Sequence, residues 1–323
     1  MAGMTDTAFR RLVKRHGGCG LVVTEMVSAE GLVRGIDRTL EYAEYTDEER
    51  PIAIQIFGGD PEKMAAAAQI VEGMGADIVD VNMGCPVPKI AKHNAGCSLM
   101  REPAHAAAVV ATMTKAVKIP VTVKMRAGWN DQDKNAASLG RMMQDAGAAA
   151  ITVHGRTAAQ SYSGSADWNL VARIAEDLDI PVFGSGDCIE PNDIIERLQL
   201  GVEGVLVGRG VLRNPWILAQ AADIASGLAP RTVTLPERGQ FLLDYIELLV
   251  HERVRDSATN VDPVGSSHDR WVINKLRALG SWFTKGLDHG SQLRTRVNTV
   301  ESLVELREVV SQFFMPSPTV ASF

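Results

Sequence analysis

One thiol stands at the end of a short apolar run, where it could act as an acid or a nucleophile. The run Ile78–Val81 predicts a buried strand. The sequence Asn-Met-Gly-Cys-Pro at 82–86 ends that strand abruptly. Gly84 permits a sharp bend and Pro86 prevents the strand from continuing. The thiol of Cys85 is therefore expected on a stiff turn just beyond a sheet.

A polar, basic loop follows the turn and ends at Asn94-Ala95-Gly96. It carries Lys89, Lys92 and His93. A thiol beside such a loop is a candidate general acid or nucleophile, and these residues alone leave both roles open. Cys97 is a competing thiol, but no proline follows it and it lies nearer the next helix, so we expect it to serve in packing.

Other polar side chains also stand where predicted strands end. They are Gln55, Lys124 and His154. An amide can bond along the edge of a flat heterocycle, a lysine can stabilise negative charge on an electron-accepting ring, and an imidazole can bond a carbonyl group. Each alone is more often structural, but together they favour a phosphorylated aromatic cofactor, and flavin mononucleotide (FMN) fits best.

Glycine-rich turns follow the last two predicted strands. The first is Gly184-Ser185-Gly186-Asp187 and the second is Gly208-Arg209-Gly210. Glycines allow backbone N–H groups to approach a phosphate, and Arg209 can add charge. Their positions match the usual phosphate site of a (β/α)₈ barrel.

A pattern repeats over roughly the first 230 residues: a β-branched run, then a polar turn, then a helix. This pattern predicts a fold that would bring these residues together. The runs are 21–24, 52–56, 78–81, 121–123, 150–153, 180–183 and 204–207. Helices are expected at 61–74 and 103–117. Polar residues gather at the carboxyl ends of nearly all these strands, which favours a TIM barrel over a doubly wound sheet with one switch point.

The alternation stops after Pro230, and a helical pattern begins at Leu235. The apolar residues of this pattern are Phe241, Leu242, Tyr245, Leu248 and Leu249. We expect a loop at 256–268 and helices at 269–284 and 291–313. The predicted domains are a barrel at 1–233 and a helical domain at 234–323.

Composition sets further limits. The chain has 323 residues, 46% of them hydrophobic and 22% charged, and a net charge of −6. Its four cysteines form no Cys-x-x-Cys pair, so no metal site is expected.

No signal peptide and no apolar run of about 18 residues is visible, which predicts a cytoplasmic protein without a membrane partner. The stretch 270–298 holds six lysines or arginines and one aspartate, a local basic surface that suits phosphates as well as it suits solvent.

The chain resembles the tRNA-dihydrouridine synthases, most closely the bacterial B type, over nearly its whole length. The motifs that carry the resemblance are Met1–Asp6, Phe9–Arg11, Thr24–Met26, Ile54–Gly58, Val81–Pro86, Lys124–Trp129, Ile151–Thr157, Tyr162–Gly164, Gly186–Asp187 and Gly208–Arg209.

The resemblance implies an FMN-dependent oxidoreductase that uses NADPH to reduce the C5–C6 double bond of uridines in tRNA. Flavin would pass hydride to C6, and Cys85 would protonate C5 as the general acid. The implied cofactor-binding residues are Met1, Ala2, Gln55, Lys124, His154, Ser185, Gly186, Asp187, Gly208 and Arg209. The implied substrate-binding residues are Asn82, Lys89, Lys92, Arg126, Arg156 and Arg277. A monomer is expected, with the basic helical stretch holding the RNA and the Lys89–His93 loop closing over it as a mobile flap.

The chain departs from the family pattern in three places. Ser185 replaces the family asparagine, which removes one amide contact but leaves the backbone turn. Ala278 and Leu279 replace a Lys-His pair after Arg277. The family also has an apolar strand before the first Met-Ala-Gly, and the loss of such a strand would rival the stability of a domain, so we expect the natural start to lie upstream.

Two other functions remain open from the residues. The first is an FMN-dependent barrel oxidoreductase that acts on a free pyrimidine, against which the basic helical stretch argues. The second is a tRNA-binding protein whose barrel no longer holds flavin, which a yellow purified protein would exclude.

Overall fold

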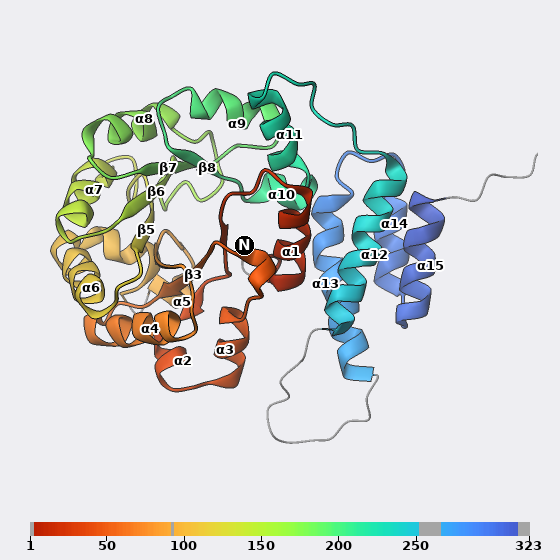
Figure 1. Cartoon of the computed structure of the whole chain (residues 1–323), viewed down its shortest axis with the longest axis horizontal. Coiled ribbons are helices and arrows are strands. Elements are labelled where there is room, and N and C mark those ends of the chain that lie inside the picture. Colours follow the sequence, from red (N-terminus) through yellow and green to blue (C-terminus); the bar gives the residue numbers. More distant parts are fainter. Residues whose placement is uncertain (1–2, 92–93, 252–265, 316–323) are drawn as a thin grey trace, which may run out of the picture.

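The computed structural model describes residues 3–91, 94–251 and 266–315. Figure 1 shows a curved sheet surrounded by helices, with a group of further helices packed beside it. Among the described residues, no helix is both long enough and apolar enough to cross a membrane.

Every strand pair of the sheet is parallel, as the barrel prediction requires. Its strands are β1 (Val22–Val23), β2 (Val27–Ser28), β3 (Ile52–Phe57), β4 (Ile78–Met83), β5 (Val121–Arg126), β6 (Ala150–His154), β7 (Val182–Ser185) and β8 (Gly204–Leu206). The order runs β1-β3-β4-β5-β6-β7-β8, and the short β2, which the sequence did not predict, also pairs with β3. The fold is of the (β/α)₈ TIM-barrel type, and in the described residues the edges of the sheet lie at β1 and β8.

The register of the central strands aligns the polar strand ends. Asn82 pairs with Lys124 across β4 and β5. Arg126 pairs with His154 across β5 and β6, and His154 pairs with Ser185 across β6 and β7. Because the strands are parallel, these side chains all belong to the carboxyl end of the barrel.

Helices surround the sheet, and short ones also lie in the loops that follow its strands. They are α1 (Thr7–His16), α2 (Ala29–Val33), α3 (Asp37–Ala43), α4 (Pro61–Gly73), α5 (Pro88–Ala91), α6 (Pro103–Ala116), α7 (Ala136–Asp145), α8 (Trp168–Asp177), α9 (Pro191–Leu198), α10 (Arg209–Arg213) and α11 (Ile217–Ala225), with 3-10 turns at Asp47–Glu49 and Gly96–Arg101. Proline opens α4 and α6, where its missing N–H costs no helical hydrogen bond, and both predicted helices are confirmed.

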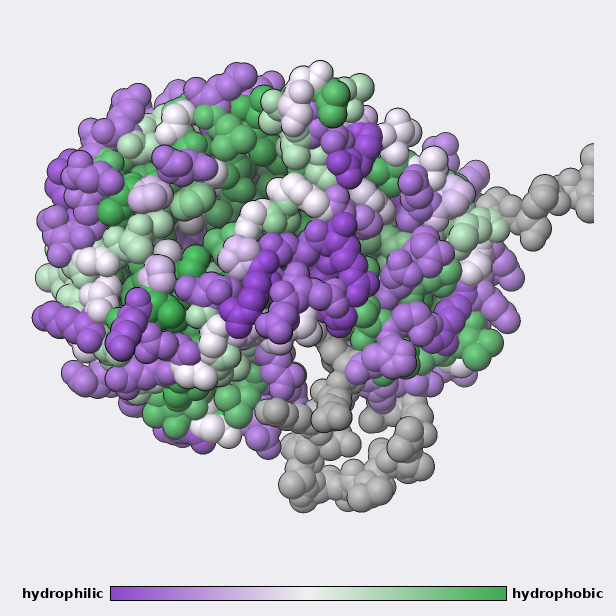
Figure 2. All heavy atoms as spheres, in the orientation of Figure 1, coloured by the Kyte–Doolittle hydropathy of each residue, from purple (hydrophilic) through white to green (hydrophobic). Residues whose placement is uncertain are grey.

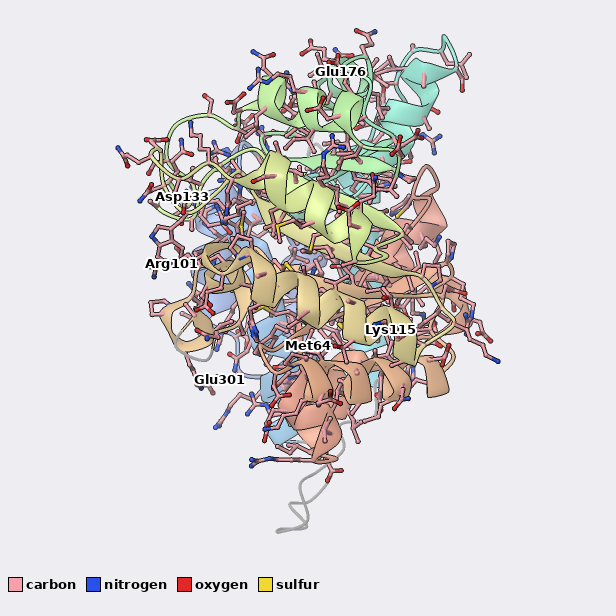
Figure 3. The ribbon with its side chains drawn as sticks, turned by 90° about the vertical axis from the view of Figure 1, so that its left-hand side faces the viewer. Met64, Arg101, Lys115, Asp133, Glu176 and Glu301 are labelled. Carbon is pink, nitrogen blue, oxygen red and sulfur yellow. The ribbon has the colours of Figure 1, made fainter. Side chains whose placement is uncertain are left out.

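The two ends of the barrel can be told apart in Figure 3. Arg101 and Asp133 follow β4 and β5 and lie at one end, whereas Lys115, in the last turn of α6, lies toward the other. Figure 2 shows hydrophobic residues in the middle of the barrel and hydrophilic residues over its outer helices.

The C-terminal part forms a helical bundle of α12 (Leu235–His251), α13 (Ser266–Phe283), α14 (Gly290–Thr299) and α15 (Leu303–Phe314). The helix predicted at 291–313 is wrong as one element. It is broken after Thr299, and Ser302 starts a new helix by accepting a hydrogen bond from the backbone N–H of Glu305. Most of the loop predicted at 256–268 lies outside the described residues.

The bundle packs against the barrel through α1. The ring of Phe9 lies edge-on to the rings of Phe241 and Tyr245, at centroid distances of 5.9 and 6.2 Å. Asp6 forms the polar part of the contact. Its carboxylate accepts a hydrogen bond from the Tyr245 hydroxyl at 2.8 Å and pairs with the Lys275 ammonium at 3.0 Å.

Asp6 also caps α1 by accepting a hydrogen bond from the N–H of Phe9. Asp6→Ala should therefore lower the free energy of unfolding by more than a helix cap alone. Asp60→Ala is a matched control, because Asp60 caps α4 through the N–H groups of Glu62 and Lys63. We expect Asp6→Ala to cost about 1 kcal/mol more than Asp60→Ala in urea unfolding, and equal losses would show that the contact with the bundle contributes nothing.

Candidate active site

The turn that carries Cys85 is held by hydrogen bonds on both sides of its backbone. The side-chain oxygen of Asn82 accepts bonds from the N–H groups of Gly84 and Cys85, at 3.1 and 2.9 Å. The carbonyl of Cys85 accepts the N–H of Cys97 at 3.0 Å, and the carbonyl of Gly84 accepts Nε of Arg126 at 2.7 Å. The half-buried thiol of Cys85 therefore stands on a backbone with little freedom to move.

Gly96 allows the loop to return to this turn. Its φ is +61°, and a Cβ built on it would lie 2.7 Å from the carbonyl oxygen of Cys85. A larger residue would push the Cys97 segment away from the turn. Cys97 itself is buried, in agreement with the expected packing role.

Lys124 is the next polar residue around the mouth of the barrel. Burial lowers the pKa of its ammonium group to about 8, although the nearby charge of Asp80 opposes the shift. No hydrogen bond or ion pair joins its Nζ to any of the residues that the structure describes. The ammonium is thus mostly charged at neutral pH and available to an anionic ligand.

His154 is a neutral hydrogen-bond donor. Its Nδ1 accepts the backbone N–H of Arg156 at 3.2 Å, so the proton of the neutral ring is on Nε2. Burial, and then the positive charges of Lys124, Arg126 and Arg156, lower the pKa of His154 to about 3. Arg126 is also the direct neighbour of His154 in the register of β5 and β6.

The loop after β7 adjoins the imidazole. Gly186 has a φ of +124°, and a Cβ there would lie 2.7 Å from Cβ of Ala166 and 3.3 Å from Cε1 of His154. Only glycine fits this gap, which leaves backbone exposed beside the imidazole. Ser185 is buried at the end of β7, in register with His154.

The carboxylate of Asp187 accepts hydrogen bonds from other residues of the protein. It accepts a hydrogen bond from Nη2 of Arg156 at 2.9 Å and one from the N–H of Ala166 at 2.8 Å. Burial acts to raise the pKa of Asp187, but these bonds and the charges of Arg156 and Arg209 outweigh it and lower the pKa. The carboxylate therefore holds the loop closed and carries a negative charge.

Arg209 remains partly accessible at the start of α10, directly after Gly208. Its guanidinium lies 4.7 Å from the ring centroid of Tyr162 and 3.5 Å from Asp187, and its side chain is 27% exposed. Tyr162, which belongs to the loop after β6, thus packs against the arginine that follows Gly208. A phosphate placed there would meet the charge of Arg209.

Three arginines expected to bind substrate use their guanidinium groups within the protein. Arg126 donates to the carbonyls of Gly84, Thr157 and Ser161. Arg156 donates to Asp187 and to the carbonyls of Ser163 and Gly164. Arg277 donates to the carbonyls of Val297, Asn298 and Val300, and so stabilises the break between α14 and α15. Contact of these arginines with a substrate stays a prediction.

Other expected site residues lie elsewhere. Lys89 is exposed on the short helix α5. Met1, Ala2, Lys92 and His93 lie outside the described residues.

Gln55 and Asn82 are joined within the mouth of the barrel. The side-chain oxygen of Gln55 accepts Nδ2 of Asn82 at 2.7 Å, and its Nε2 donates to Asp80, also at 2.7 Å. Sequence reasoning assigned no role to Asp80. The available signal was a carboxylate inside the apolar run Ile78–Val81, because a buried charge requires partners.

The parallel barrel with a thiol, an ammonium and a neutral imidazole at the carboxyl ends of its strands defines a TIM-barrel enzyme. The chain belongs to the dihydrouridine synthase (Dus) family, whose model matches residues 1–315. This is a family of flavin-dependent oxidoreductases.

Two curated relatives extend over most of the chain. A probable tRNA-dihydrouridine synthase of Rickettsia conorii is 35% identical over 97% of this chain and 91% of its own length. A tRNA-dihydrouridine synthase B of Xanthomonas campestris pv. campestris is 38% identical over 94% of this chain and 87% of its own. Among solved structures, histamine dehydrogenase from Rhizobium sp. 4-9 shares the fold, with a TM-score of 0.52 and 14% identity over 97% of this chain and 60% of that one.

The depressed pKa of His154 predicts a pH-dependent stability. Between pH 6.5 and about 3 the unfolded chain binds a proton at this residue and the folded chain does not, so stability falls as pH falls through this window. His154→Gln should reduce this slope by up to about 1.4 kcal/mol per pH unit, measured by urea unfolding at pH 4.5, 5.5 and 6.5. The exposed His251 gives the control variant His251→Gln, and equal slopes for both variants would contradict the assignment.

Proposed function

We propose that this protein is a tRNA-dihydrouridine synthase that uses FMN, reduced by NADPH, to saturate the C5–C6 bond of uridines in tRNA. The observation that carries the proposal is the rigidly held thiol of Cys85 in a barrel mouth shared with Lys124 and His154. The family match over residues 1–315 and the names of the relatives support it.

The residues of the mouth fit a phosphorylated flavin. Lys124 offers an ammonium and His154 an N–H donor to the electron-rich edge of the ring. Gly186, where a Cβ would not fit, and Gly208, directly before Arg209, suit the phosphate, and backbone groups there can replace the amide that Ser185 lacks. FMN, when bound, would supply the hydride chemistry, with NADPH as the reductant.

Cys85 would donate a proton to C5 of the uracil ring. The developing negative charge at C5 needs a nearby acid, and a thiol can act as one near neutral pH. The pinned backbone of residues 84 and 85 would hold the thiol in place without help from the substrate. Asn82 belongs to the same turn and would orient it.

The bundle favours tRNA over a free pyrimidine as the substrate. A hollow of about 610 Å³ lies between the end of α13 and the start of α14, and Trp282, Lys285, His289 and Arg294 are among the residues that line it. Basic and aromatic groups suit a nucleic-acid backbone and its bases. Residues 234–323 would bind the RNA as a monomer in the cytoplasm, residues 1–233 would catalyse, and the target base would be flipped into the barrel.

Cys85→Ala should abolish dihydrouridine formation while the protein remains yellow. We expect a loss of at least about 100-fold, because the variant lacks the proton donor. The measurement is dihydrouridine mapping in tRNA from a bacterial strain that lacks its own synthases and carries this chain. Cys97→Ala is the matched control, since it keeps the backbone N–H that binds Cys85, and full activity of Cys85→Ala with loss in Cys97→Ala would reverse the assignment.

Lys285→Ala should weaken tRNA binding without changing flavin content. One lost phosphate contact should reduce the slope of log K against log salt by about 0.7–0.9, measured by filter binding between 50 and 200 mM salt. Lys115→Ala is the control, because Lys115 is exposed at the opposite end of the barrel (Figure 3). Equal slopes for the two variants would remove Lys285 from the RNA-binding surface.

A further inference from the structure

A chain of hydrogen bonds leads from the buried interior of the sheet to the Cys85 turn. Thr122 donates to Oδ1 of Asp80 at 2.6 Å, and Gln55 donates to Oδ2 at 2.7 Å. Asn82 then donates to the side-chain oxygen of Gln55 at 2.7 Å and accepts the N–H groups of the turn. Three neighbouring strands, β3, β4 and β5, contribute to this chain.

The chemistry of the two ends fixes the direction of every bond between them. The ionised carboxylate of Asp80 can only accept, so Gln55 must turn its NH₂ group toward it. The oxygen of Gln55 then faces Asn82, which must present its own NH₂ group. That leaves the oxygen of Asn82 for the backbone N–H of Cys85, which can only donate.

We propose that Asp80 is a positioning residue, which fixes the orientations of Gln55 and Asn82 and thereby the backbone that carries the Cys85 thiol. The inference rests on the proposed function only in naming Cys85 as the acid. The positioning itself depends on the chain of bonds alone.

The burial of Asp80 suits this role. Its side chain lies within β4 and is 5% exposed, and burial raises its pKa, while the bonds from Thr122 and Gln55 and the charge of Lys124 act in the opposite direction. A carboxylate in such a place is retained only where its partners satisfy it. Because both oxygens are used, a change at Asp80 reaches Gln55 directly.

The rate at which iodoacetamide alkylates Cys85 reports the freedom of the turn without tRNA or turnover. Mass spectrometry of the Cys85 peptide from the flavin-bound protein gives this rate. In Asp80→Leu the bond that orients the Gln55 amide, and through it the Asn82 amide, is lost. We expect alkylation about tenfold faster, the effect of one lost hydrogen bond on a local opening. In the same variant kcat for tRNA reduction should fall while KM for tRNA stays unchanged.

Asp80→Asn should restore both values nearly to those of the original protein. Its oxygen can accept from Gln55, and the Thr122 hydroxyl can rotate to accept from its NH₂ group. Combining Asp80→Leu with Asn82→Ala should give the same alkylation rate as Asn82→Ala alone, because Asp80 acts through Asn82.

Glu49→Gln separates positioning from loss of stability. Glu49 is another fully buried carboxylate, and it binds Arg10 on α1, away from the turn. We expect no change of Cys85 alkylation in this control. If Asp80→Leu does not fold, Gln55→Met breaks the chain at its next link and should give the same acceleration.

Three outcomes would overturn the proposal. They are an original alkylation rate in Asp80→Leu or Gln55→Met, equal acceleration in Glu49→Gln, and failure of Asp80→Asn to restore the rate. Loss of the proposed function would appear separately, as full dihydrouridine formation by Cys85→Ala.

Discussion

An acceptor-only carboxylate and a donor-only backbone turn limit how β3, β4 and β5 can be arranged. Asp80 must meet Gln55 and Thr122 across two strand interfaces, and both meetings depend on register. A slip of one residue would turn Asp80 to the opposite face of the sheet and leave a buried charge without partners. The registers that satisfy this carboxylate also bring Asn82 beside Lys124. The strand registers that give the buried carboxylate its hydrogen-bond partners are therefore the same registers that assemble the mouth of the barrel.

The cations around the mouth divide into two groups. Arg126 and Arg156 spend their hydrogen bonds on loop carbonyls and on Asp187, so they order the loops after β4, β6 and β7. Their charge still reaches His154 and keeps the imidazole neutral. Lys124 is partly buried and forms no hydrogen bond with the described residues, and the side chain of Arg209 is partly exposed, so these two cations can bind a ligand. The two arginines thus keep the electrostatic potential of the site positive, and Lys124 and Arg209 are the cations that can bind a ligand.

The sequence predicted the barrel because its strands, buried on both faces, are continuous apolar runs that end in polar turns. It also predicted Cys85, Lys124 and His154 as site residues because Lys124 and His154 directly follow such runs and Cys85 lies in the turn after one. The sequence could not show that Arg277 donates hydrogen bonds to the segment after α14, because these bonds join residues 20 or more positions apart. The break at Thr299 was missed because apolar residues continue through it, and the cap at Ser302 is a local signal that periodicity does not record. The partners of Asp80 lie 25 and 42 residues away, which is why pattern alone gave it no role.

The contact between α1 and α12 has a consequence for how the chain is made. Phe9 is buried against Phe241 and Tyr245, and Asp6 bonds a hydroxyl 239 residues further along. During synthesis α1 leaves the ribosome long before α12 has been made. The apolar face of α1 that packs against α12 is therefore exposed to solvent while most of the barrel is translated. Domains emerge and fold in order from the N-terminus, and exposed apolar surface on such intermediates promotes aggregation. The beginning of the barrel can therefore be covered only after α12 and, with Lys275, α13 have been made.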